Sequence, residues 1–133
     1  MYKRIKFKKK PLMPNQVIIK DKDSILTSGN FIQLTGQAKT CKTSVLIEIT
    51  KSLIDGQSRL GFEFEKCPQD KEVVYINTEL SAWDLHLHYE RIIKSLGEDD
   101  DIDNLIFFDG QSMGPDKLKE YLREYLKHGN PYV

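Results

Sequence analysis

The chain has little cysteine and no long apolar run. Its two cysteines, Cys41 and Cys67, form no C-x-x-C pair and have no histidine at ligand spacing. We therefore expect neither a disulfide framework nor a zinc site, and we expect a reducing, cytoplasmic location. No apolar stretch approaches the ~18–20 residues that a membrane helix needs, so no membrane partner is expected.

The formal net charge is zero, but positive and negative residues are unevenly distributed along the chain. Residues 1–66 carry 13 Lys/Arg against 6 Asp/Glu, a balance of +7, and residues 67–133 carry the opposite balance. The basic run within residues 1–14 is typical of a solvated tail, with a nucleic-acid-binding arm as the sharper alternative. The acidic run over residues 98–103 lacks the spaced ligands of a calcium loop, which favours a solvated loop.

The length of 133 residues suits one domain, which we place at residues 15–133 after the tail at 1–14. Strand-like runs alternate with amphipathic helical runs, which predicts an α/β fold with a parallel sheet flanked by helices. The expected strands are 17–19, 31–35, 73–76 and 105–108, with a turn at 21–24 and a hairpin near 62–64. The expected helices span 42–54, 81–97 and 114–128, and residues 132–133 look like the start of a further strand.

The strongest motif is a phosphate loop. It is formed by Gly36, Gln37, Ala38, Lys39, Thr40, Cys41, Lys42 and Thr43, with Ser44 following. It fits the Walker A pattern G-x-x-x-x-G-K-[ST] except at Cys41, where glycine is usual. The apolar run at 31–35 leads into it, and a helix begins at Lys42, which is the context that the motif requires.

In such a loop, backbone N–H groups and the helix dipole hold a phosphate. Lys42 is expected to reach the β- and γ-phosphates, and the Thr43 hydroxyl to ligate Mg²⁺. At Cys41 the side chain must point away from the phosphate. Lys39 is either solvated or a second contact to the γ-phosphate.

The loop, its helix and the following strand, which ends in Asn77-Thr78-Glu79, resemble the RecA/RepA-like P-loop ATPases, which include AAA ATPases of plasmids, phages and mobile elements. The resemblance covers roughly residues 12–133. It implies that Glu79 polarises the attacking water, although Asn77 departs from the acid often found there. The alternative for Glu79 is an acid favoured at a helix N-terminus by the dipole alone.

The resemblance also implies a Walker B Asp at the end of an apolar strand. Asp109 matches that local pattern but comes one helix too early, so a turn residue is the favoured interpretation. The Walker B strand is then expected beyond Val133, which makes the chain an N-terminal fragment. A fragment of this kind is expected to bind ATP and Mg²⁺ but to hydrolyse ATP poorly without the missing strand.

The sequence therefore predicts an ATP-binding ATPase domain acting in DNA replication or mobilisation, with a homo-oligomer as the full-length protein. Two alternatives stay open. One is a small nucleotide kinase-like transferase with Asp109 as its Mg²⁺ partner. The other is a non-catalytic nucleotide-binding or assembly module. A GTPase is disfavoured because no Asn-Lys-x-Asp segment is present.

Overall fold

The computed structural model describes Lys8 and residues 12–133, so most of the predicted basic tail lies outside the described residues. In chain order the elements are β1 (Gln16–Lys20), β2 (Asp23–Thr27), α1 (Lys42–Asp55), β3 (Glu63–Phe64), β4 (Val73–Asn77), α2 (Ala82–Ser95), β5 (Leu105–Asp109) and α3 (Pro115–His128). The fold is a mixed α/β structure, as the sequence predicts at the level of fold class.

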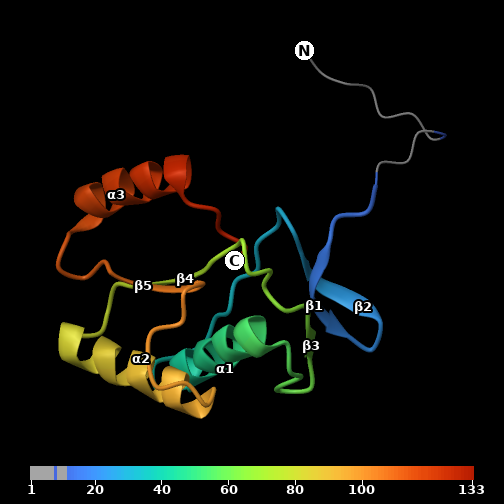
Figure 1. The fold of residues 1–133 in the computed structure, drawn as a ribbon, viewed down its shortest axis with the longest axis horizontal. Helices are drawn as coiled ribbons and strands as arrows, with labels where there is room; N and C mark the ends of the chain where they lie inside the picture. Colours follow the sequence, from blue (N-terminus) through green and yellow to red (C-terminus); the bar gives the residue numbers. More distant parts are fainter. Residues whose placement is uncertain (1–7, 9–11) are drawn as a thin grey trace.

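The parallel strands β4 and β5 form the centre of a layered unit. They pair in register from Val73 with Leu105 to Asn77 with Asp109. On one face of the pair, Phe107 stacks on Tyr75 and packs against Tyr89 of α2. On the other face, the ring of Phe108 meets α3 edge-on. Helices α1 and α2 therefore lie on one side of the strands and α3 on the other (Figure 1).

The strand predicted to start at residues 132–133 is present only as an isolated bridge beside β4. Pro131 forms a parallel bridge with Glu72. The N–H of Val74 donates to the carbonyl of Val133 at 2.8 Å, whereas the N–H of Val73 donates to Asn104 on the β5 side. Successive N–H groups of a strand point to opposite sides. Residues 131–133 therefore run along the edge of β4 opposite β5.

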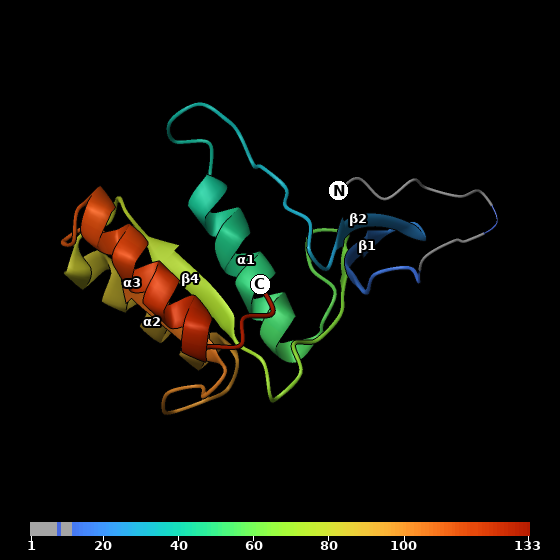
Figure 2. The ribbon, with the colours of Figure 1, turned by 90° about the horizontal axis from the view of Figure 1, so that it is seen from above.

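A second sheet, antiparallel and in the order β2-β1-β3, lies at the other end of the molecule (Figures 1 and 2). Its hairpin turns within Asp21 and Lys22, both at positive φ. The predicted turn at 21–24 is therefore too long, because Asp23 and Ser24 already belong to β2. The two sheets share one core, in which Leu53 of α1 packs among residues of both.

The strand predicted over Phe31–Thr35 does not form. This segment is unpaired, and the side chain of Phe31 is 91% exposed. A β-rich composition yields a strand only where a neighbouring edge offers hydrogen bonds. Ile32 and Leu34 instead lie against α1 beside Leu46, in an apolar hollow of about 210 Å³.

The apolar strand β4 is only partly buried. Val73 and Asn77 are buried, but Ile76 is 41% exposed. Helix α3 packs its aromatic rings on Phe108 of β5 and leaves Ile76 uncovered. Helix α3 itself contains no buried residue. Among the helices of the described part of the chain, none has the length and apolar character needed to cross a membrane.

The C-terminal end of α1 is held by an ion-pair cluster. Arg59 donates two hydrogen bonds of 2.7 Å to the carboxylate of Asp55 and a third, of 3.2 Å, to the buried hydroxyl of Ser52. Burial alone raises the pKa of Asp55, but the hydrogen bonds from Arg59 and from the N–H of Gln57, with the charge of Arg59, lower it overall. The cluster fastens residues 56–62 onto the helix.

Arg59→Ala should lower the free energy of unfolding by about 1–2 kcal/mol at neutral pH, because it removes a charged hydrogen-bonding partner. The folded-state pKa of Asp55 is depressed below its ordinary value of 3.8. Its contribution is therefore present above that pH and lost as pH falls through the folded pKa. Urea unfolding of both proteins at neutral and acidic pH measures this, with Lys119→Ala as a control. An equal difference at both pH values would contradict the assignment.

Candidate functional site

The predicted phosphate loop forms a tight turn directly before α1. Two of its non-glycine residues, Lys39 and Cys41, adopt left-handed backbone conformations, with φ of 63° and 61°. The Thr40 hydroxyl donates to the carbonyl of Gln37 at 2.6 Å. A Cβ at Gly36 would lie 2.8 Å from that hydroxyl oxygen, so a larger residue there would displace the Thr40 side chain. Figure 2 shows the loop at the N-terminal end of α1.

Lys42 ties the loop to the helix. Its ammonium donates to the carbonyl of Gly36 at 2.8 Å and to that of Gln37 at 2.7 Å. The side chain therefore folds back over the loop, and its charge lies among the loop's backbone groups. No side chain caps the N-terminus of α1, and no acidic residue occurs in its first turn. The helix dipole and the ammonium thus give this end of α1 a positive potential.

A pocket of about 230 Å³ brings this end of α1 together with the end of β4. Lys42 and Thr43 line it from the helix, and residues 75–80 line it from the strand and the loop that follows, including Glu79. Leu34 and Leu46 supply an apolar wall. Residues 37 positions apart in the sequence, Lys42 and Glu79, therefore face one cavity.

The loop that carries Glu79 is held by Asn77. This side chain is 5% exposed. Its Nδ2 donates to the carbonyl of Leu80 at 2.8 Å, and its Oδ1 accepts from the N–H groups of Leu80 and Glu79 at 2.9 and 3.3 Å. An aspartate at this position has no such donor and could not bond the Leu80 carbonyl in this way.

The other predicted residues lie around the pocket rather than within it. Gln37, Ala38, Lys39 and Thr40 are exposed on the loop, and Cys41 and Ser44 are exposed at the start of α1. Sequence reasoning missed Asn77 as a structural residue of the site. It also missed Gly110, whose N–H donates to the Asn77 carbonyl at 2.7 Å and where a Cβ would lie 2.9 Å from that oxygen. A polar residue that ends a buried strand, and a glycine that follows the next one, were the available signals.

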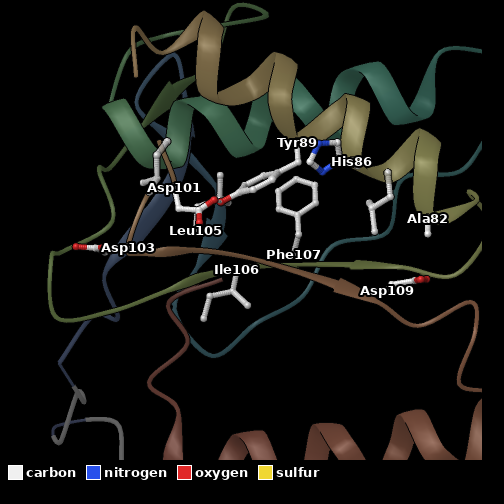
Figure 3. A pocket seen from close by; sticks show the side chains of 11 residues that line it. Ala82, His86, Tyr89, Asp101, Asp103, Leu105, Ile106, Phe107 and Asp109 are labelled. Carbon is white, nitrogen blue, oxygen red and sulfur yellow. Dashed lines mark hydrogen bonds between the residues drawn. The ribbon is translucent and has the colours of Figure 1, made fainter. Parts of the chain in front are cut away.

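Asp109 does not line the pocket that holds Lys42 and Thr43. Its carboxylate accepts the N–H of Gln111 at 3.2 Å, which is the geometry of a turn residue at the end of a strand. It lies instead at one end of a separate hollow of about 490 Å³ between α2 and β5 (Figure 3). These contacts fit Asp109 as a turn residue at the end of β5.

The hollow beside β5 carries a strong hydrogen bond of its own. The hydroxyl of Tyr89 donates to Asp101 at 2.9 Å, as Figure 3 shows. Burial, with this hydrogen bond and the charge of Asp101, raises the pKa of Tyr89 to about 12. The hydroxyl therefore keeps its proton over the physiological range and fastens the acidic loop 98–103 to α2.

Comparison of the chain with known proteins finds no significant match. No protein-family model matches the chain, and no curated protein or solved structure matches it significantly. The chemistry that the site supports therefore follows from its own geometry.

Cys41→Gly should raise the free energy of unfolding by up to about 1 kcal/mol, because glycine adopts a left-handed conformation without the steric cost of a Cβ. Cys41→Ala is the matched control, since it removes the thiol but keeps the Cβ, and it should give no such gain. Urea unfolding of the three proteins measures the difference. A gain with alanine equal to that with glycine would mean that the thiol, rather than the backbone, is the source of the strain.

Proposed function

We propose that this chain is an ATP-binding domain of P-loop NTPase architecture, of the RecA/RepA-like class, in a protein that hydrolyses ATP with Mg²⁺. The observation that carries the proposal is the shared pocket. A loop of Walker A sequence presents Lys42 and Thr43 to the same cavity into which the end of β4 brings Glu79. A phosphate-binding group and a candidate base on one cavity are what phosphoryl transfer to water requires.

The loop fits a phosphate chain in both charge and shape. The uncapped N-terminus of α1 offers backbone N–H groups, and Lys39 and Lys42 add two positive charges beside it. The left-handed residues Lys39 and Cys41 turn the backbone tightly around the space in front of the helix. The apolar Leu34 and Leu46 form one wall of the pocket.

The residues also fit Mg²⁺ when it arrives with the nucleotide. Thr43 lines the pocket and offers a hydroxyl oxygen. Within residues 12–133, no cluster of three or more His, Cys, Asp or Glu side chains is arranged to hold a metal by itself. Mg²⁺ typically takes one or two protein ligands and completes its shell with phosphate oxygens and water. The bound metal–nucleotide supplies the phosphoryl group and neutralises its charge.

Each residue then has a defined task. Lys42 exchanges its two loop carbonyls for phosphate oxygens and neutralises the charge that develops there. Glu79 accepts a hydrogen bond from the attacking water and receives its proton as the oxygen–phosphorus bond forms. Asn77 keeps Glu79 in place through three hydrogen bonds to the loop backbone. ADP leaves with the electron pair of the broken bond.

The alternatives differ in what they require of other residues. A kinase-like transferase would need Asp109 at the metal, and Asp109 lines the separate hollow beside β5, which disfavours it. A non-catalytic module would bind nucleotide without turnover. Coupling of ATP hydrolysis to DNA replication or mobilisation, in a homo-oligomer, is the biological setting that the resemblance supports.

Lys42→Ala should weaken binding of Mg-ADP at least about tenfold, because a charged hydrogen-bonding partner of a phosphate is worth ~1.5–3 kcal/mol. Isothermal titration calorimetry measures the affinity. Lys119→Ala, an exposed lysine on α3, is the matched control and should bind like the wild type. Equal affinity of Lys42→Ala and wild type would contradict the assignment of residues 36–43 as a phosphate-binding loop.

Glu79→Gln should leave Mg-ADP affinity within about twofold and lower the rate of phosphate release ~10²–10⁴-fold, the usual contribution of a positioned base. The Lys42→Ala protein sets the background of the assay. Wild-type binding without phosphate release above this background would fit either the non-catalytic module or an ATPase domain that lacks its Walker B residue. An unchanged rate in Glu79→Gln would exclude Glu79 as the base.

A further inference from the structure

The outer edge of β5 presents unpaired backbone groups. Hydrogen bonds at both ends of the β4–β5 ladder, from Val73 to Asn104 and from Gly110 to Asn77, show that even-numbered residues of β5 face β4. The carbonyl of Leu105, both backbone groups of Phe107 and the N–H of Asp109 therefore face away from it. In the described part of the chain, no strand pairs with this edge. Such an edge is a template for a further strand.

The surroundings of this edge are acidic and hollowed. The hollow of about 490 Å³ runs along the edge beneath α2, with Phe107 and Leu85 among its apolar lining residues. Figure 3 shows Asp101 and Asp103 at one end and Asp109 at the other. The neighbouring loop adds three exposed acids, Glu98, Asp99 and Asp100. An extended, positively charged peptide complements the open edge and the acids around it.

The chain itself contains such a peptide. Residues 4–8 alternate strictly, with Arg4, Lys6 and Lys8 separated by Ile5 and Phe7. This period of two places the basic side chains on one face of a strand and the apolar ones on the other. Its five residues equal the length of β5.

We propose that the N-terminal segment 4–8 of a second copy of this chain adds as a strand to the outer edge of β5. The donor is a second copy because Leu12 leads into β1, which lies across the molecule from α2 and β5 in both views (Figures 1 and 2). Each copy offers one segment and one edge at different places. The contact is therefore head-to-tail and builds chains or rings. The proposal does not depend on nucleotide binding.

Two variants of the full-length chain separate the donor from the acceptor. Lys6→Gln/Lys8→Gln weakens the segment without making it complementary to a reversed surface, and Asp99→Lys/Asp103→Lys spoils the acidic surface without removing a hydrogen bond described above. The control Glu65→Lys/Glu120→Lys matches the acidic-surface variant, because it makes the same change in net charge at exposed acids elsewhere. Circular dichroism establishes that each protein is folded. Sedimentation velocity at low salt then measures the mass of each protein and of their mixtures.

The wild type and the control should form species larger than a dimer, and association should weaken at least ~10-fold between ~0.05 M and ~0.5 M salt. Each test variant alone should be a monomer. An equimolar mixture of the two should form a dimer and nothing larger, because only one intact segment and one intact edge remain. A monomeric wild type, a monomeric mixture, or an acidic-surface variant that still associates like the wild type would each overturn the proposal.

Discussion

The parallel pairing of β4 with β5 is the constraint on which the rest of the structure depends. It fixes the ends of the two strands side by side, with Asn77 opposite Asp109. The loops that follow then lock together through the hydrogen bond from Gly110 to the Asn77 carbonyl and the approach of Gln111 to the Glu79 carbonyl at 3.5 Å. Since α1 packs on the same face as α2, its N-terminus is delivered to the end of β4. The candidate site is a consequence of this arrangement.

The polar side chain of Asn77 fixes the position of the loop that follows β4. A buried amide is costly unless its donors and acceptors are bonded. Here the side chain bonds backbone groups of Glu79 and Leu80, and the backbone carbonyl bonds Gly110. The loop therefore has little freedom to move Glu79 away from the pocket. Lys42 has the corresponding role on the opposite wall, where its ammonium holds the phosphate loop closed.

The sequence predicted the helices well because their signals are local. The helices predicted over 42–54, 81–97 and 114–128 correspond to α1, α2 and α3, with Ser81 capping α2 and Gly56 following α1. The segment Phe31–Thr35 failed because a strand needs a partner edge, and composition cannot supply one. The antiparallel sheet around β1 was missed because β3 has two residues and pairs with a strand 45 positions earlier. Motif spacing singled out Lys42 and Thr43, the resemblance singled out Glu79, and the structure brings all three to one pocket. The roles of Asn77 and Gly110 depend on contacts between distant loops.

The most direct test of the phosphate-binding account is a titration of the ¹⁵N-labelled chain with Mg-ADP, followed by amide chemical shifts. The account predicts the largest shifts at the N–H groups of residues 36–44, with smaller ones at residues 77–80, and none along α3. Shifts that instead concentrate in the hollow between α2 and β5, or a spectrum unchanged at millimolar nucleotide, would contradict it.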